Sequence, residues 1–556
     1  MLFEGKHELF AGRIAHLIRS DYSGNDRQVR GSADAGPQRS DLSPFPRKDA
    51  STMLSQFVPR SKSPLEVGTE IDSPTIRIRC GSSSGRTHRG RQRGDLKAPY
   101  CGGEIRGRVA LLVASLGLLM MFSSHGAAWD SDEEVTAWTG ARVMTMEGHD
   151  YPSGTLVVKH GKILAVGSDE DVVPPPGARV IDAGGKIIMP GLICTHSHIG
   201  GIGGADSSHP IQPDVRIHDS INVRDSGFKR AVAGGLTTLN IMPGSGHLLG
   251  GQTIYVKLRR AETIDDMMIR ADDGWIMGGL KMANGTNPIR EASGFPGTRG
   301  KSAALVRQFM IRAREYGDKI ERADGDPDKL PPRDIGLEAM LEVFDKRRIV
   351  HHHTHRHDDI MTVLRLAAES DFRVVLHHVS DGWKLADQLA AAEASCSVIM
   401  IDAPGGKIEA KDLSMETGAI LEQAGVLVAF HTDDYITDSR LFFRSAALAV
   451  RGGMSREGAL KALTINGAKM LDLDDRTGSL VVGKDADFIV LDGDPLSVYS
   501  KVLETWVEGE KVFDRGDPQD RLYAVGGYGA THDQSPYFCC YHELMMQMLR
   551  LEGASE

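Results

Sequence analysis

Cysteine is scarce in this chain, and its spacing indicates neither a disulfide scaffold nor a structural metal site. The 556 residues contain six cysteines and no CxxC pair, whereas both kinds of site need regularly spaced cysteines. A glycine-rich phosphate loop is also missing after the first strand of the long central region, which argues against nucleotide binding. With 41% hydrophobic and 25% charged residues, the composition is that of an ordinary globular protein, not of a fibrous or membrane-embedded one.

Positive charge is lacking from most of the chain. Residues 1–108 contain 19 lysines and arginines against 12 acidic residues, so they carry about +7 and the remainder carries about −17. Nucleic-acid binding needs a basic surface that meets the phosphates. We therefore expect no nucleic-acid partner.

The first 128 residues divide into two segments of different character. Residues 1–105 are rich in Ser, Arg, Gly and Pro, so we interpret them as a disordered segment or as an N-terminal extension added by an over-long gene model. Residues 106–128 resemble a signal peptide, with Arg106 and Arg108 before the apolar run Val109–Phe122. That run is short for a membrane span, so stable membrane insertion is not expected. If the segment is used, the protein is exported to the periplasm or secreted; otherwise it is cytoplasmic, and an unusual N-terminal anchor is the other alternative.

Short alternating strands occur on both sides of a long middle region. Residues 132–190 and 471–516 have the turn residues and the period of two that are typical of antiparallel sheets. We expect them to form one small composite β-sandwich domain, built from both flanks of the region between them. Residues 517–556 are interpreted as a C-terminal tail.

The middle region, residues 191–470, alternates apolar strands with amphipathic helical patterns, the latter at 301–320, 359–370 and 456–471. Repeated β–α units over this length predict a parallel sheet covered by helices. The fold class is therefore α/β, and a (β/α)₈ TIM barrel is the commonest closed form at this size. An open, doubly wound sheet is the alternative.

Polar residues end several of the apolar strands in this region. In a barrel such residues converge on one mouth, and residues i and i+2 of a strand point to the same side. The pair in "CTHSH" can therefore reach one ion. Lys281 either reaches solvent or pairs with a carboxylate, or it is buried with the lowered pKa that carbamate formation requires. The residues predicted as metal ligands are His196, His198, Lys281, His353, His378 and Asp433.

The motifs "PGLICTHSH", "GLKMANGTNP", "HHTHRHDDI", "LHHVSDG", "FHTDD" and "GKDADFIVLDGDP" together resemble the amidohydrolase superfamily, and within it the imidazolonepropionase-like enzymes and their secreted dipeptidase-like relatives. The resemblance covers about residues 132–516. It implies a barrel with a composite β-sandwich and one or two divalent ions, with Zn²⁺ suited to the nitrogen and oxygen ligands. The residue two before the first histidine is commonly Asp in that family and is Cys194 here.

The resemblance also implies a role for each predicted ligand. His196, His198 and Asp433 would bind one ion, His353 and His378 a second, and Lys281, as a carbamate, would bridge the two. Asp433 would also act as general base for a metal-activated water. Strand periodicity alone does not separate His353 from His351 or His355, and if Lys281 is unmodified the site holds a single ion.

The substrate predicted from these features is a small molecule with an amide C–N bond: a cyclic amide, an N-acyl amino acid or a dipeptide. Hydrolytic deamination and phosphotriester or lactone hydrolysis are the enzymatic alternatives, and a degenerate binding protein is the non-enzymatic one. A homo-oligomer is among the possible assemblies. Four further side chains are candidates for substrate binding: His247, His355, Arg356 and Tyr435.

Overall fold

A computed structural model describes most of the chain from residue 135 onwards. The described residues are 135–527 and 530, except 201–205, 207, 293, 402–406 and 435. The predictions for residues 1–105, for the signal-like segment 106–128 and for Tyr435 lie outside this set. Within it, every helix is too short or too polar to cross a membrane.

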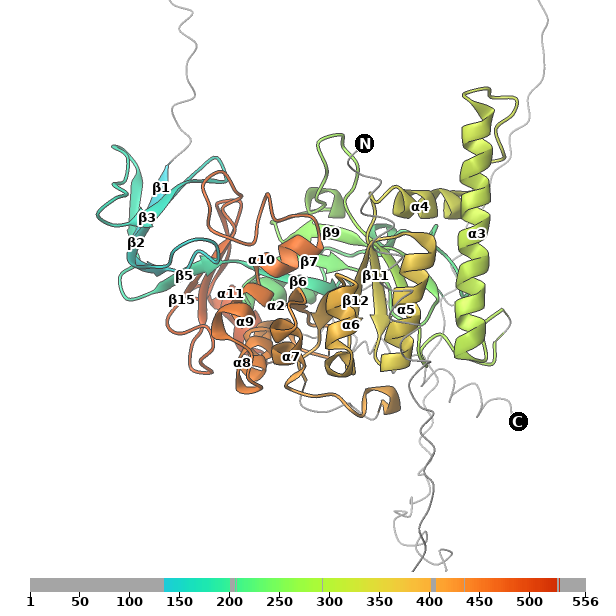
Figure 1. Ribbon diagram of the computed structural model, residues 1–556. Helices are drawn as coiled ribbons and strands as arrows, with labels where there is room; N and C mark the ends of the chain where they lie inside the picture. Colours follow the sequence, from blue (N-terminus) through green and yellow to red (C-terminus); the bar gives the residue numbers. More distant parts are fainter. Residues whose placement is uncertain are drawn as a thin grey trace, which may run out of the picture. The chain divides into compact units, whose positions relative to one another are not determined.

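The segments that flank the middle region form one mixed sheet of eight strands (Figure 1). Its strands are β1 (Thr136–Val143), β2 (Tyr151–Lys159), β3 (Lys162–Ser168), β4 (Arg179–Asp182), β5 (Ile187–Pro190), β15 (Phe488–Leu491), β16 (Val502–Val507) and β17 (Glu510–Asp514). The order is β17-β16-β15-β5-β1-β2-β3, with β4 beside β1. The strands predicted as a sandwich thus pair as a single continuous sheet.

The two flanks are joined where β15 pairs antiparallel with β5 and places Phe488 opposite Pro190. Trp138, Phe488 and Trp506 pack together on one face, with the Trp138 ring edge-on to both others at centroid distances of 4.8 and 4.9 Å. Buried aromatic contacts of this kind contribute more than their area alone. This core holds together strands that lie more than 300 residues apart in the sequence.

The middle region supplies nine further strands. They are β6 (Leu192–Ser197), β7 (Leu236–Ile241), β8 (Leu249–Gln252), β9 (Ile254–Lys257), β10 (Leu280–Ala283), β11 (Val350–Thr354), β12 (Val374–His378) and β13 (Ser395–Val398), and β14 (Val428–Phe430) completes the series. They form a six-stranded sheet, β14-β13-β12-β11-β10-β8, and a three-stranded sheet, β6-β7-β9. The strands from β10 to β14 are parallel, as are β6 and β7.

Two features differ from the predicted all-parallel barrel. Strand β8 runs antiparallel to β10, and β9 runs antiparallel to β7. Only Thr253 separates β8 from β9, so one bent segment passes from the larger sheet to the smaller. In the described residues the strand pairing remains that of two open sheets and does not close.

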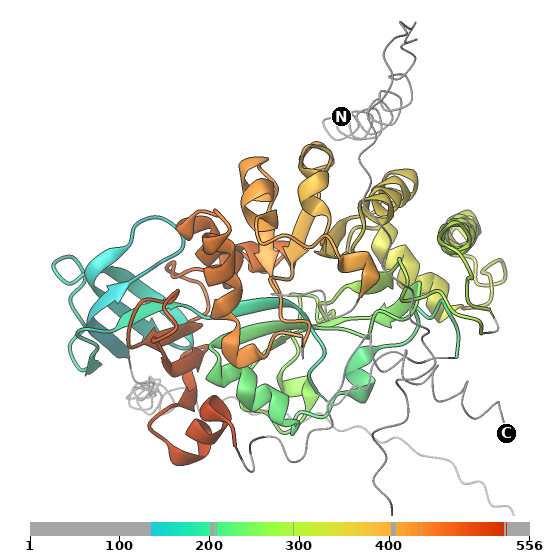
Figure 2. The ribbon, with the colours of Figure 1, turned by 90° about the horizontal axis from the view of Figure 1, so that it is seen from below.

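Helices cover the outside of these sheets. They are α2 (Ser226–Ala233), α3 (Arg299–Ala323), α4 (Ile335–Phe344), α5 (His357–Ser370), α6 (Ala386–Ala391), α7 (Thr417–Gln423), α8 (Phe443–Arg451), α9 (Arg456–Ala462), α10 (Ile465–Met470) and α11 (Pro518–Val525). Short 3₁₀ turns are η1 (Ile217–Ser220), η2 (Ile264–Asp266), η3 (Gly382–Lys384), η4 (Ile408–Ala410) and η5 (Ser439–Leu441). Figure 2 shows the strands in the middle, with the yellow and orange helices on one side and α2 on the other.

Sequence periodicity located the long helix but missed one break. The predicted helix at 301–320 lies within α3, which begins after Thr298, whose side chain accepts a hydrogen bond from the Lys301 amide. The predicted helix at 456–471 is two helices, α9 and α10. The break occurs at Thr464, whose φ and ψ of −133° and −104° are not helical, although the apolar period continues through it. Part of the predicted tail forms α11.

A buried ion cluster joins the eight-stranded sheet to the middle region. Lys257, at the end of β9, lies 2.8 Å from a carboxylate oxygen of Asp485 and also hydrogen-bonds Asp487. All three side chains are at most 3% exposed. Arg259 supports the same junction through a two-pronged ion pair with Glu508.

We expect Lys257→Met to destabilise the fold by about 3–5 kcal/mol, because it leaves buried Asp487 without its cation and removes the buried one of the cations that pair with Asp485. Urea unfolding followed by circular dichroism measures this. Lys162→Met is the matched control, since Lys162 also pairs with Asp485 but is 51% exposed, and an exposed pair contributes about 1 kcal/mol or less. Equal losses in the two variants would contradict this account of the junction.

Candidate metal centre

The first group of ligand atoms lies where β6 meets the end of β14. Strand alternation points His196 and His198 to the same side, with their Nε2 atoms 3.0 Å apart. Oδ1 of Asp433 lies 3.3 Å from Nε2 of His196 and 3.1 Å from Nε2 of His198. The Asp433 amide donates to the His196 carbonyl at 3.1 Å, which fixes the two segments together. Asp433 has a φ of 48°, a conformation unusual for a residue other than glycine.

The spacing of these three atoms fits one small cation. Nitrogen and oxygen ligands at the usual 2.0–2.1 Å from a tetrahedral ion lie about 3.3 Å from one another, and the three separations here are 3.0, 3.1 and 3.3 Å. Oδ1 of Asp433 is buried and has no hydrogen-bond donor among the described residues. A divalent cation is therefore the partner that this donor set fits.

Lys281, at the second position of β10, lies beside this group. Its amine is fully buried, 3.2 Å from Nε2 of His196 and 3.1 Å from the sulfur of Met242. Gly250 lies close to its aliphatic part, where a Cβ would be 3.6 Å from Cγ of Lys281. The predicted bridging residue is thus adjacent to the first ligand group.

A second group of nitrogen ligands comes from the ends of β11 and β12. One ring nitrogen from each of His353, His355 and His378 lies within 4.8 Å of the other two. Nδ1 of His353 and Nε2 of His378 are buried without a hydrogen-bond partner in the part of the chain that the structure describes. The structure therefore brings His355 into the same cluster as the two histidines predicted as ligands.

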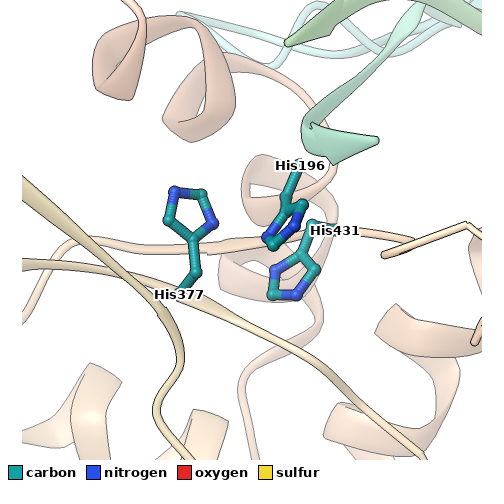
Figure 3. A group of neighbouring side chains, drawn as sticks. All are labelled: His196, His377 and His431. Atoms are coloured by element: carbon teal, nitrogen blue, oxygen red, sulfur yellow. The ribbon is translucent and has the colours of Figure 1, made fainter. Parts of the chain in front are cut away.

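A third group, drawn in Figure 3, contains two histidines that the sequence analysis did not select. His196, His377 and His431 also offer ring nitrogens within 4.8 Å of one another. The His431 ring stacks on that of His196, with centroids 5.0 Å apart. His431 stands two residues before Asp433, and His377 directly precedes His378, so their positions next to predicted ligands were the available signals.

Several neutral groups orient the ligands. The Met242 carbonyl lies 2.8 Å from Nδ1 of His198, and the Ser397 hydroxyl lies 2.7 Å from Nδ1 of His431. Cys194, which stands where Asp is common, points its sulfur to the His196 carbonyl at 3.1 Å. Burial raises the pKa of the Cys194 thiol to about 12, so it remains protonated.

The two adjacent aspartates after β14 have different surroundings. Asp434 accepts hydrogen bonds from the hydroxyls of Ser197, Thr432 and Ser439. These bonds satisfy its carboxylate and fix the loop, whereas Asp433 faces the histidines. Burial alone would raise the pKa of Asp433, but the adjacent His198 and the nearby Lys281 lower it, so this carboxylate is ionised.

Burial keeps the clustered imidazoles neutral. It is the main cause that lowers the pKa of His196, His353 and His378 well below the usual value, and the nearby Lys281 charge adds to the effect. Neutral imidazole is the form that binds metal ions. The electrostatics of the site therefore favour ligation over protonation.

Lys407 and Glu409 approach the second group from the loop after β13, and sequence analysis missed both. The Lys407 amine lies 3.0 Å from Nε2 of His355 and 3.2 Å from Nε2 of His353. It also pairs with buried Glu409 at 3.1 Å, and Glu409 in turn contacts Arg299 at 3.3 Å. Neither residue ends an apolar strand, so the rule used to select candidates could not find them.

The residues predicted to bind substrate lie in different places. His355 joins the second ligand group, as described above. His247 is buried, with its Nε2 3.5 Å from Arg290. Arg356 forms a two-pronged ion pair with Asp358 at the start of α5, at 2.9 and 2.6 Å. Tyr435 lies outside the described residues.

Comparison with known proteins assigns the family. Residues 187–513 match the model of the amidohydrolase family. An amidohydrolase from Thermotoga maritima has a solved structure that is 33% identical, with a TM-score of 0.64, over 68% of this chain and 100% of that one. The imidazolonepropionase of Fusobacterium nucleatum is 24% identical over 62% of this chain and 87% of its own length.

Another relative, the amidohydrolase tasK of Hapsidospora irregularis, is 25% identical over 68% of this chain, but the chain spans only 42% of that protein's length. The family model covers more than half of the chain and spans both ligand groups. The chain therefore belongs to the amidohydrolase family, a class of hydrolases that act on carbon–nitrogen bonds.

Because these histidines are buried in the neutral form, we expect the free energy of unfolding to fall as the pH is lowered. The folded-state pKa is lowered for His196, His351, His352, His353, His355, His377, His378 and His431. The unfolded chain therefore binds more protons below its histidine pKa of about 6.5, and each histidine removes about 1.4 kcal/mol per pH unit there.

Urea unfolding of the chelator-treated protein at about pH 7.5, 6.5 and 5.5 measures this dependence. We expect the free energy of unfolding to fall by a few kcal/mol between the first two values, and by more between the second and the third. A free energy of unfolding that is unchanged down to about pH 5.5 would show that these histidines are not buried in the neutral form.

Proposed function

We propose that this protein hydrolyses the C–N bond of a small amide, in a cyclic amide, an N-acyl amino acid or a dipeptide, with Zn²⁺ as its cofactor. The proposal rests on the triangle formed by Nε2 of His196, Nε2 of His198 and Oδ1 of Asp433, with sides of 3.0–3.3 Å. A buried carboxylate and two imidazole nitrogens suit zinc. Family membership supports the reaction class.

A second ion is proposed at His353 and His378, with His355 as an additional candidate ligand. Their buried ring nitrogens lie within 4.8 Å of one another. Lys281, as a carbamate, would bridge the two ions, since its amine lies 3.2 Å from Nε2 of His196 and is shielded from solvent. The carbamate would form from the unprotonated amine and CO₂, so the amine would first lose its proton.

Asp433 is the residue proposed to move protons. Bound divalent ions would supply Lewis acidity that polarises the scissile carbonyl and lowers the pKa of the attacking water. Oδ1 of Asp433 lies against the two β6 histidines, and Oδ2 lies 3.9 Å from Nδ1 of His378, so the carboxylate stands between the two ligand groups. It accepts a proton from the water that attacks the carbonyl carbon, and donates it to the nitrogen as the C–N bond breaks.

The two open sheets are proposed to be parts of one (β/α)₈ barrel. Strand β6, at the edge of the smaller sheet, meets β14, at the edge of the larger, through the bond from the Asp433 amide to the His196 carbonyl. The bent segment β8–β9 connects the other two edges. Eight strand positions then surround the ligand groups, as the barrel architecture requires.

Asp433→Asn removes the charge of a proposed ligand, so we expect it to weaken zinc binding by more than about 100-fold. Loss of a residue that only hydrogen-bonds to a ligand typically weakens binding by about 10- to 100-fold. We expect amide hydrolysis to fall by at least about 10³-fold, in the range seen when a general base is lost. Zinc competition with a chelator and a hydrolysis screen of dipeptides, N-acyl amino acids and cyclic amides measure the two effects. Asp472→Asn, which changes a half-exposed carboxylate paired with Arg373, is the control. Full turnover in Asp433→Asn would rule out the proposed role.

Lys407 is proposed to bind a carboxylate of the substrate. The Lys407 side chain is 20% exposed, and its amine contacts both Glu409 and the second ligand group. Arg356, the sequence-based candidate for substrate binding, forms a two-pronged ion pair with Asp358 at the start of α5. All three proposed substrate classes can carry such a carboxylate. A charge-assisted hydrogen bond is worth about 1.5–3 kcal/mol.

Lys407→Met should therefore raise KM for an N-acyl amino acid by about 10- to 100-fold, with kcat changed by less than about threefold. The C-terminally amidated analogue, which lacks the carboxylate, should be hydrolysed equally well by both proteins. Lys411→Met, an exposed lysine on the same segment, is the matched control, and zinc content is measured in parallel. An equal rise in KM for the amidated analogue would exclude carboxylate binding.

A further inference from the structure

A row of hydrogen-bonded side chains extends from the ligand groups into the interior of the sheets. The Tyr255 hydroxyl lies 2.9 Å from Nε2 of His351, and Nδ1 of His351 lies 2.9 Å from Nε2 of His377. These residues belong to β9, β11 and β12. None of them is used by the proposed reaction.

The row of Tyr255, His351 and His377 occupies interior positions that aliphatic side chains usually fill. The interior of a barrel is normally filled by Val, Ile and Leu, yet His351 and His377 are 0% exposed and Tyr255 is 2% exposed. Gly279 precedes β10, and a Cβ at that position would lie 2.2 Å from Cδ2 of His351. Any larger residue there would displace the His351 ring.

The row ends at a nitrogen without a partner. Nδ1 of His377 is buried and has no hydrogen-bond partner among the residues that the structure describes, and the same holds for Nδ1 of His196. The two rings are nearly perpendicular, at 86°, with centroids 4.9 Å apart. Figure 3 shows one ring nitrogen of His377 directed towards His196 and His431.

His196 needs an acceptor at this place. An imidazole that binds a cation through Nε2 carries its proton on Nδ1, and that N–H almost always donates to a carboxylate, a carbonyl or a water. Cys194 is a poor acceptor, since its sulfur already contacts the His196 carbonyl and the Thr432 hydroxyl. Buried polar atoms left without a partner cost free energy, so pairing the two Nδ1 atoms stabilises both.

We propose that His377, held by His351 and Tyr255, is a positioning residue that accepts the Nδ1 proton of His196, directly or through one water. This inference rests on the proposed metal-dependent function. Each neutral imidazole has one donor and one acceptor, so the whole row is then fixed. His377 donates from Nε2 to Nδ1 of His351, and His351 donates from Nε2 to the Tyr255 oxygen. His196 keeps its Nε2 lone pair for the ion.

Two amide substitutions test the two ring nitrogens of His377 one at a time. Nδ1 faces His196, and Nε2 faces His351. The side-chain amide of Asn overlies Nδ1 of histidine, and that of Gln overlies Nε2. Zinc affinity of the full-length wild-type, His377→Asn, His377→Gln and His377→Leu proteins is measured by competition with a chelator. Urea unfolding of each metal-free protein reports any general damage to the fold.

The expected result is a loss of zinc affinity of about 10- to 100-fold for Gln and Leu, and of less than about threefold for Asn. Equal affinities for Asn and Gln, or wild-type affinity in all three variants, would overturn the inference. Loss of one whole equivalent of zinc in every variant would also overturn it, because His377 would then be a ligand of an ion between the three histidines of Figure 3.

The hydrolysis screen separates this inference from the proposed function. A wild-type protein that binds zinc but cleaves no amide would refute the function, while the ranking of the variants would still decide the role of His377. A wild-type protein that binds no zinc would overturn the inference as well. His352→Gln is the control for replacing a buried histidine, because His352 lines a separate cavity of about 380 Å³.

Discussion

The hydrogen bond between the Asp433 amide and the His196 carbonyl brings together the two sheets on which the site depends. It joins the end of β14, at the edge of the larger sheet, to the end of β6, at the edge of the smaller. Side-chain hydrogen bonds of Cys194 and Ser197 to Thr432 and Asp434 support the same junction, which places the carboxylate of Asp433 against the β6 histidines. The positive φ of Asp433 is a local cost that the surrounding structure must offset, since such strain persists only where other contacts enforce it.

The second constraint is desolvation. A charge inside this region would be costly, because the side chains are buried and shielded from bulk solvent. The imidazoles avoid that cost by remaining neutral, while Asp433 stays ionised because His198 and the nearby Lys281 charge favour its negative form. The imidazoles do not balance the negative charge of the Asp433 carboxylate, and a divalent cation bound beside it would. The geometry and the charge balance thus indicate the same kind of ligand.

Much of the site followed from strand periodicity and position. Strand alternation placed His196 and His198 on one side, and the order of apolar runs located Lys281, His353, His378 and Asp433 at the ends of separate strands. Periodicity could not choose between His353 and His355, because both lie on the same side of the strand, and the structure places both beside His378. Lys407 was out of reach of this reasoning, since it lies outside the strands and follows no repeating pattern.

The fold shows the same division between local and long-range information. The helix at α3 could be predicted because its apolar period and the cap at Thr298 are local features. The reversed direction of β8 and β9 could not, because it depends on which strand each one pairs with. The break between α9 and α10 could not be predicted either. The apolar residues continue with the helical period through Thr464, although the backbone there is not helical.

The replacement of the common Asp by Cys194 changes how the ligands are supported. A carboxylate that accepts the distal N–H of a histidine raises the basicity of that ligand. Here the neighbours of the ligand histidines are neutral: the Met242 carbonyl at His198, the Ser397 hydroxyl at His431, and an imidazole at His196. Neutral acceptors transfer less electron density to the ligand, so a cation held here would keep more of its positive charge. That positive charge is what polarises a carbonyl group. With Cys194 in place of the common Asp, the carboxylate of Asp433 is the only full negative charge among the described ligand atoms of the first group.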